Sequence, residues 1–241
     1  PSGDKAVVSN YVGGSLSLFE IKGDGTLNPA YQVFEYNTTE KASHAHSAQF
    51  YKSNLFVSDL GMDALYIYTL NNDGKNYDLV SSSSVSIAQK AGPRHFVITK
   101  DGHFIYNINE YASTITASKK EINGFLLIDN YSTLAKDYKG ANSCADIHLS
   151  KNEDFLYGSN RGENTIAVFK RNTVDGTLTK IQNIDVEGEW PRNFTLDPTG
   201  KFLLVANQKS NTISVFKIHP DSGTLSYLNS VKTPSPVCLL F

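Results

Sequence analysis

The chain has 241 residues, a length at which an all-β barrel or propeller commonly forms one unit. Its 22 basic and 24 acidic residues give a formal charge of −2 and form no long run of one sign, which argues against a nucleic-acid or anionic-membrane surface. No apolar run approaches the ~20 residues that cross a bilayer, and Cys144 and Cys238 are too far apart to indicate a disulfide framework or a zinc site, so we expect two buried thiols.

Five hairpins recur along the chain at a period of about fifty residues. Each reads as strand, short polar turn and strand, and they begin at Ala6, Leu55, Ile105, Leu156 and Leu203. An Asn or Asp closes the first strand of every hairpin, at Asn10, Asp59, Asn109, Asn160 and Asn207. Recurrence in every repeat indicates a scaffold role, in which this side chain bonds the backbone of the turn.

Further strands flank the hairpins. Four hairpins are preceded by short strands, which are HSAQF from His46, RHFVIT from Arg94, ADIHLS from Ala145 and RNFTLD from Arg192. A fourth strand follows polar turns such as TVDGT and PDSGT, and we expect the run Ser81–Ser84 to lie in one of these outer strands. The least regular region, residues 123–140, is expected to be an outer strand followed by a loop. Four antiparallel strands at this period describe the blade of a β-propeller.

The two ends of the chain fit the same repeat. The sequence opens with PSGDK inside a blade, which then has only its second to fourth strands, and it ends with SPVCLLF, which resembles a lone first strand. We therefore predict an all-β propeller of four-stranded antiparallel blades, in which residues 1–241 form a single domain with about five blades.

Two repeat positions place polar side chains on one face near the propeller axis. The residues that open the first strands are His46, Arg94, Ala145, Arg192 and Val237. The residues just past the ends of the second strands are Tyr11, Leu60, Glu110, Arg161 and Gln208. Arginine forks hold carboxylate or phosphate and stabilise a developing oxyanion, while a Glu or His moves a proton or activates water. The sequence thus predicts a site for an anionic ligand.

The stretches GPRHFVITKDGHFIYNINE, SNRGENTIAVFKR and PRNFTLDPTGKFLLVANQ closely resemble the lactonase family with a seven-bladed propeller fold. The resemblance runs from Pro1 to Phe241, and the family includes bacterial propeller-type 6-phosphogluconolactonases and the fungal carboxy-cis,cis-muconate lactonizing enzyme. Seven blades at this period need roughly 340 to 360 residues. The resemblance therefore implies that about two blades are missing on the N-terminal side, and we expect residues upstream of Pro1 to supply them.

The resemblance also implies the site residues. The catalytic set is expected at His46 of HAHS, Arg94 of GPRH, Glu110 of NINE and Arg161 of SNRG. Substrate-binding candidates are Arg192 of WPRN, Gln208, and His44, which is also read as a structural neighbour of His46. Salt bridges between blades for the arginines and simple charge neutralisation by Glu110 stay open as alternatives, and so does the choice of His46 or Glu110 as base.

No metal and no organic cofactor is expected. His44 and His46 point to one side of a strand, but a metal would need a third ligand that no motif supplies.

The activity that the resemblance implies is hydrolysis of a sugar lactone, 6-phosphogluconolactone, by attack of water on the lactone carbonyl. Lactone formation on a muconate and a non-enzymatic binding platform are the alternatives. We expect an anionic small-molecule lactone as partner, no nucleic acid and no membrane, and a monomer or weak homodimer. A cytoplasmic location is expected, with the periplasm left open because a signal peptide would lie upstream of Pro1.

Overall fold

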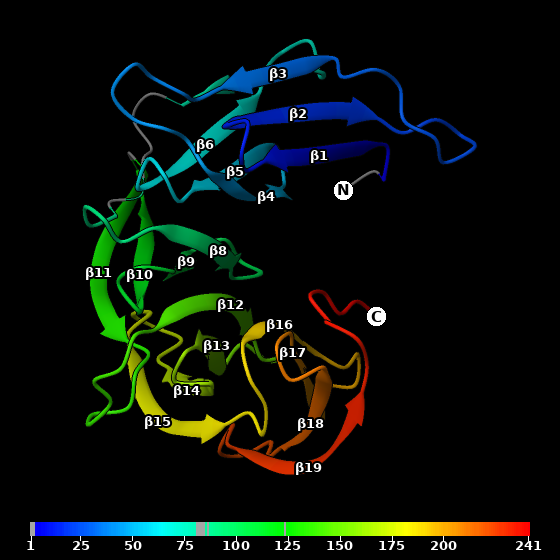
Figure 1. The fold of residues 1–241 in the computed structure, drawn as a ribbon. Helices are drawn as coiled ribbons and strands as arrows, with labels where there is room; N and C mark the ends of the chain where they lie inside the picture. Colours follow the sequence, from blue (N-terminus) through cyan, green and yellow to red (C-terminus); the bar gives the residue numbers. More distant parts are fainter. Residues whose placement is uncertain (1–2, 81–84, 86, 123) are drawn as a thin grey trace. The chain divides into compact units, whose positions relative to one another are not determined.

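The computed structural model describes residues 3–80, 85, 87–122 and 124–241, and these form 19 β-strands and no helix (Figure 1). The strands pair into five antiparallel sheets, one with three strands and four with four. The sheets fall into two compact units, residues 1–94 with 120–126 and residues 95–119 with 127–241. The expectation of a single domain stays a prediction.

The first unit contains two sheets. The three-stranded sheet consists of β1 (Lys5–Asn10), β2 (Ser15–Glu20) and β3 (Gln32–Glu35). The four-stranded sheet consists of β4 (Ala45–Tyr51), β5 (Asn54–Asp59), β6 (Ala64–Leu70) and β7 (Tyr77–Leu79). Their shared core includes the buried side chains of Leu16, Leu18, Leu55, Val57 and Tyr68.

The second unit is built mainly from three four-stranded sheets. The first consists of β8 (Pro93–Ile98), β9 (Phe104–Asn109), β10 (Thr114–Glu121) and β11 (Gly124–Ser132). The next consists of β12 (Ser143–Leu149), β13 (Phe155–Arg161), β14 (Thr165–Arg171) and β15 (Leu178–Asp185). The last consists of β16 (Pro191–Leu196), β17 (Phe202–Asn207), β18 (Thr212–Ile218) and β19 (Leu225–Lys232). Apolar clusters fill the space on either side of the middle sheet.

The predicted hairpins, the first strands ahead of four of them and the outer strands that the described residues cover are confirmed. A residue in the left-handed region explains how each hairpin turns. It lies four positions after the repeated Asn or Asp, with φ between 54° and 69°, at Gly14, Asp63, Ser113, Asn164 and Asn211. Gly, Asn and Asp take this conformation most readily, which fits all of these positions except Ser113.

The repeated Asn and Asp side chains are structural, and among the described residues Asp59 bonds the backbone of its own hairpin turn as predicted. Its carboxylate accepts the backbone N–H groups of Met62 and His44 at 3.0 and 2.8 Å. The amides donate Nδ2 to Ser or Thr hydroxyls of the returning strand, as at Asn109 and Asn207. The difference follows from chemistry, because a carboxylate can only accept whereas an amide also donates.

A β-bulge recurs in the first strand of three sheets, at the position predicted to open that strand. The register shifts at His46, between Ala45 and Ser47 in β4, and at Arg192, between Pro191 and Asn193 in β16. In β12 the bulge spans Ala145 and Asp146. A bulge re-aims side chains and commonly accompanies binding sites.

Some expectations are wrong or fall outside the described residues. SPVCLLF is not a strand in the structure. Two of its backbone N–H groups donate to asparagine side chains, Ser235 N to Asn211 Oδ1 at 2.8 Å and Leu239 N to Asn193 Oδ1 at 2.7 Å. Cys144 is buried as expected, whereas Cys238 is exposed. The predicted outer strand at Ser81–Ser84 lies outside the described residues.

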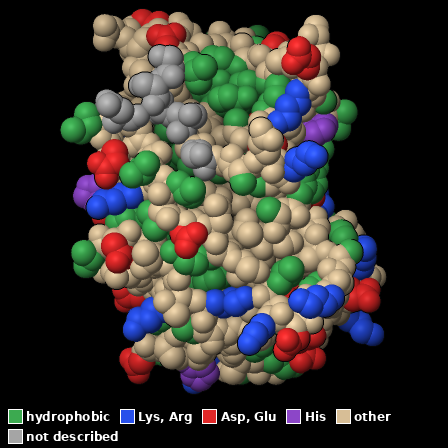
Figure 2. Space-filling model, turned by 90° about the vertical axis from the view of Figure 1, so that its left-hand side faces the viewer, with side chains coloured by type: hydrophobic (Ala, Val, Ile, Leu, Met, Phe, Trp, Pro, Cys, Tyr) green, Lys and Arg blue, Asp and Glu red, His purple; other side chains and the backbone are tan. Residues whose placement is uncertain are grey.

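The surface bears on the expected partners. On the face drawn in Figure 2, acidic and basic side chains are interspersed and neither sign forms a continuous patch. Across the described part of the chain, nothing helical has the length and apolar character of a membrane span.

Candidate functional site

Glu110 and Arg161 form an ion pair at the ends of two second strands in the unit of residues 95–119 and 127–241. Glu110 directly follows β9 and Arg161 closes β13, and Arg161 Nη2 lies 2.8 Å from Glu110 Oε2. The Arg161 side chain is 5 % exposed and that of Glu110 17 %. A pair this enclosed is screened little by solvent, so its geometry is strongly held.

The start of β12 fixes the Arg161 guanidinium from the other side. Nε donates to Ser143 O at 3.1 Å, and Nη2 donates to Ser143 Oγ at 3.1 Å and to Cys144 O at 2.8 Å. Ser143 Oγ in turn donates to Glu110 Oε1 at 3.2 Å. Serine, glutamate and arginine therefore form a closed network, and within the described residues Nη1 is the guanidinium nitrogen that this network leaves for a ligand.

Cys144 does not act as a nucleophile in this arrangement. Burial raises the pKa of its thiol to about 11, although hydrogen bonds from Thr133 and the charge of Arg161 pull the other way. At neutral pH the group is an uncharged thiol, which is a weak nucleophile.

Trp190 lies beside this pair, and two cationic side chains approach its indole ring. The Arg161 guanidinium carbon is 5.5 Å from the centre of the indole ring, and Lys209 Nζ is 3.4 Å from it. Trp190 O accepts the backbone N–H of Gln208 at 3.1 Å, so the turn after β17 is tied to the loop before β16. Gln208 reaches this area through its backbone.

A second polar cluster on the first strands of the same unit is centred on the buried Asp146. Its carboxylate contacts His95 Nδ1 at 2.7 Å, His148 Nε2 at 3.2 Å and Asn193 Nδ2 at 2.6 Å. Burial acts to raise the pKa of Asp146, but the charge and hydrogen bonds of His148 and His95 hold it well below its usual range. Burial likewise opposes protonation of His148, and Asp146 outweighs it and raises the pKa of His148. The carboxylate thus ties β8, β12 and β16 together.

The other unit holds His44, His46 and Arg94. The His44 ring stacks on Tyr11 at 4.6 Å between centroids and its Nδ1 is 3.0 Å from Tyr11 O, while His46 meets the Tyr11 ring edge-on at 5.6 Å. Arg94 is 3 % exposed, and its carbonyl accepts the Ser58 hydroxyl at 2.6 Å. His44 therefore has a packing role in addition to the substrate contact expected of it.

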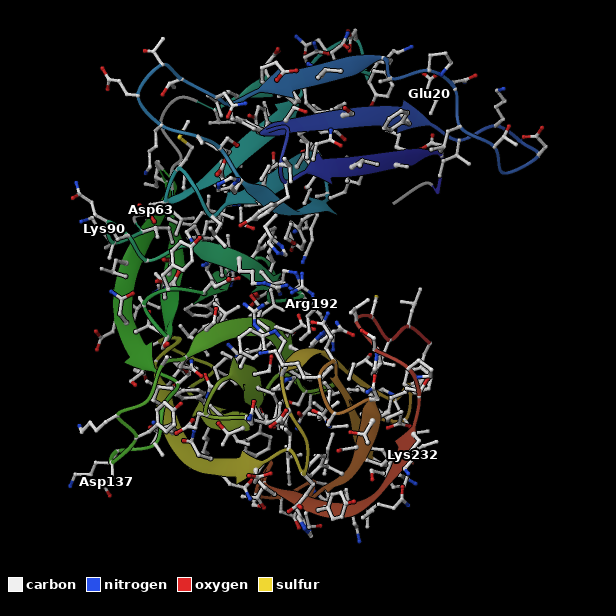
Figure 3. The ribbon with its side chains drawn as sticks, in the orientation of Figure 1. Glu20, Asp63, Lys90, Asp137, Arg192 and Lys232 are labelled. Carbon is white, nitrogen blue, oxygen red and sulfur yellow. The ribbon has the colours of Figure 1, made fainter. Side chains whose placement is uncertain are left out.

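The structure brings together Glu110 and Arg161 among the predicted residues. Arg192 occupies the bulge of β16 in the same unit (Figure 3). The described residues contain no group of three His, Cys, Asp or Glu side chains placed to hold a metal ion.

Sequence reasoning missed Ser143, Trp190 and Lys209. Ser143 and Trp190 occupy one repeat position, two residues before the strand-opening residues Ala145 and Arg192, and His44 holds the same position before His46. Each contacts the residue at the preceding second-strand end, in the pairs Tyr11–His44, Glu110–Ser143 and Arg161–Trp190. Extending the repeat two residues upstream would have found both.

Comparison with known proteins identifies relatives of similar fold. The profile of the family described as "Lactonase, 7-bladed beta-propeller" matches residues 1–241. A 6-phosphogluconolactonase of Formosa agariphila is 36 % identical over 212 residues, which covers 83 % of this chain and 60 % of that protein. A 6-phosphogluconolactonase of Bacillus subtilis is 31 % identical over 245 residues, covering 98 % of this chain and 69 % of that protein.

A solved structure agrees with the sequence matches. The periplasmic gluconolactonase of Pseudomonas aeruginosa has a TM-score of 0.89 at 29 % identity, and the match covers 97 % of this chain and 68 % of that one. The chain spans 60 % of the length of the Formosa relative and 69 % of the Bacillus relative. With a family match over its whole length, this chain belongs to the lactonase family of seven-bladed β-propellers.

Proposed function

We propose that this chain carries the active site of a lactone hydrolase that acts on a sugar lactone, 6-phosphogluconolactone, by attack of water on the lactone carbonyl. The observation that carries the proposal is the enclosed network of Glu110, Arg161 and Ser143 in a member of the lactonase family. Lactone opening needs a base for water and a cation for the oxyanion, and this network holds one of each.

Glu110 is the base in this mechanism. Arg161 holds one of its oxygens and Ser143 donates to the other, and an ionised carboxylate can take up a proton from water. The water oxygen bonds to the carbonyl carbon as its proton passes to Glu110. When the tetrahedral intermediate collapses, the ring C–O bond breaks and the proton passes to the departing alkoxide oxygen, which yields the open-chain acid.

Arg161 stabilises the negative oxygen that develops during attack. Three hydrogen bonds and the ion pair with Glu110, all through Nε and Nη2, keep the guanidinium plane from turning, so Nη1 is preorganised to donate to that oxygen. Preorganised donors in an enclosed site are commonly worth about 10²–10³ in kcat each. His46 and Arg94 stay candidates from the sequence alone, with His46 as the alternative base.

Glu110→Gln tests the proposal. Glutamine keeps the shape and can still bond Ser143 and Arg161, but it cannot take up a proton, so we expect kcat/KM for 6-phosphogluconolactone to fall at least about tenfold with the melting temperature little changed.

Glu163→Gln is the matched control, because Glu163 bonds Asn160 of β13 and Ala135 of the loop after β11 instead of Arg161. It should cost stability and leave kcat/KM near that of the parent. Equal activity of Glu110→Gln and the parent protein would remove Glu110 from the mechanism and move the role of base to His46.

A further inference from the structure

Trp190 and Lys209 stand next to the candidate catalytic pair and have no role in the chemistry above. Lys209 Nζ lies 3.4 Å from the centre of the indole ring, and this cation–π contact holds the ammonium group over the ring face. Arg161, which approaches the same ring, is the residue that bonds Glu110. Trp190 therefore joins an ordered surface cation to the reaction centre.

The backbone conformation of Trp190 favours a residue smaller than tryptophan, so the indole ring is a candidate for a functional role. Its φ is +65°, a conformation that glycine adopts freely and that a bulky residue adopts only at an energetic cost. Two neighbouring segments impose it, because Trp190 N donates to Asn164 Oδ1 at 3.0 Å and Trp190 O accepts from Gln208 N at 3.1 Å. The ring is thus held rigidly where a small residue would fit more easily.

Two cations, Arg161 and Lys209, approach the ring, and the carboxylate of Glu189, which directly precedes Trp190, forms no ion pair among the described residues. Within the described part of the chain, neither Lys209 nor Arg192, which stands two residues after Trp190 in the bulge of β16, forms an ion pair, whereas the charge of Arg161 is already met by Glu110. A lysine ammonium whose one side faces an indole keeps hydrogens on its other side, and it binds phosphate as a point charge.

We propose that Trp190, Lys209 and Arg192 form the subsite for the phosphate group of the substrate, with the indole as a rigid wall along the sugar and Lys209 as the main phosphate contact. This inference rests on the proposed lactone hydrolysis and deepens it. The subsite selects phosphorylated over unphosphorylated sugar lactones and leaves the opening of the ring to Glu110 and Arg161.

Kinetics of Lys209→Met in the full-length protein test the selection. Methionine keeps most of the apolar stem and removes the charge. We expect the ratio of kcat/KM for 6-phosphogluconolactone to that for gluconolactone to fall at least about tenfold, the size of one charge-assisted hydrogen bond at an exposed site. Lys217→Met, at the opposite end of β18 and also exposed, is the control and should leave the ratio unchanged.

Fluorescence gives a readout that needs no turnover. The printed sequence contains a single tryptophan, so in this part of the protein emission reports on Trp190 itself. In a form of the protein in which any further tryptophan has been replaced by phenylalanine, 6-phosphogluconate should shift the emission at a concentration at least about tenfold lower than gluconate does. Lys209→Met should abolish that difference, and inorganic phosphate should compete with 6-phosphogluconate.

The outcomes separate the subsite from the proposed function. An unchanged ratio in Lys209→Met, or equal effects of 6-phosphogluconate and gluconate on the emission, would overturn the subsite while hydrolysis still stands. If the parent protein hydrolyses neither lactone, the proposed function fails, and a phosphate-dependent shift that Lys209→Met removes would support the anion subsite alone.

Discussion

At the scale of single residues, Arg161 is the centre of the candidate site. It bonds a carboxylate, a hydroxyl and two backbone carbonyls, and its guanidinium faces an indole. A planar fork with five donors can satisfy this many partners at once, whereas an ammonium cannot. The position therefore depends on the shape of arginine as much as on its charge.

Arg161→Lys tests that dependence. The charge is kept, but the shorter side chain cannot span Glu110, Ser143 and Cys144 together, so we expect kcat/KM to fall at least about tenfold and stability to fall by about 1–3 kcal/mol. Steady-state kinetics and thermal melts of the same preparation measure both. Full activity in the lysine variant would show that charge alone suffices and that the network is not preorganised for catalysis.

Asp146 and His148 give the protein a pH-dependent contribution to stability. The depressed pKa of Asp146 means that its contribution is present above the ordinary carboxyl range and is lost only as pH falls through the lower folded value. The raised pKa of His148 means that its contribution is complete below pH 6.5 and is lost as pH rises through the higher folded value. The cluster should therefore stabilise most between about pH 4 and 6.5.

His148→Gln should remove the alkaline part of this dependence. Melting temperatures measured from pH 5.5 to 8.5 should decline less steeply above pH 6.5 in the variant than in the parent, with His95 and Asp146 still in place. His103→Gln is the control, since His103 is 67 % exposed and its ion pair is with the exposed Asp101. Parallel pH profiles for parent and His148→Gln would contradict the assignment.

At the scale of elements, neighbouring sheets of the second unit are joined by a repeated contact. Tyr106 and Tyr157 donate their hydroxyls to the carbonyls of Gly176 and Gly223, at 2.9 and 3.0 Å. Both glycines lie in the polar turns TVDGT and PDSGT, have positive φ, and pack so closely on a ring that a Cβ would overlap Phe104 or Phe155. These turns align the sheets and so position the second-strand ends that carry Glu110 and Arg161.

Gly223→Ala measures this contact. The added methyl would both strain the positive φ and overlap the Phe155 ring, so we expect a loss of about 3 kcal/mol or more, seen as a fall in melting temperature of roughly 6–12 °C. Gly74→Ala isolates the first effect, because Gly74 has a φ of +70° and open space around it. That control should lose only about 1 kcal/mol. Equal losses in the two variants would mean that the turn does not lock onto Phe155.

The strands themselves were predictable because each obeys a local rule. Alternating apolar residues, polar turns and the fifty-residue period fixed the hairpins that begin at Ala6, Leu55 and Leu156 and the strands that flank them. The bulges at His46 and Arg192 were not predictable, because a bulge depends on how two strands pair and leaves no mark in either strand alone.

The candidate site was predicted in part for a similar reason. Glu110 and Arg161 stood out because charged residues broke an otherwise structural repeat, and the structure pairs them. Ser143 and Lys209 are ordinary polar residues in sequence, and their place in the site follows from tertiary contacts. Trp190 carried a weak signal, as the single tryptophan of the sequence directly before Pro191 and Arg192.

At the scale of the whole molecule, the chain combines the sheets of the propeller family with the enclosed ion pair of Glu110 and Arg161. Its sheets, its match to the lactonase family over residues 1–241 and its similarity to a periplasmic gluconolactonase agree on the fold. The chain spans 60 % and 69 % of the two relatives named 6-phosphogluconolactonase, so the activity of the full-length protein has to be measured directly.

That measurement is the hydrolysis of freshly generated 6-phosphogluconolactone by the full-length protein, followed against the spontaneous rate under the same conditions. The proposed mechanism predicts a rate that is far above the spontaneous rate and proportional to protein concentration. A rate equal to the spontaneous one would contradict lactone hydrolysis and leave lactone formation on a muconate, or binding without catalysis, as the use of the Glu110 and Arg161 site.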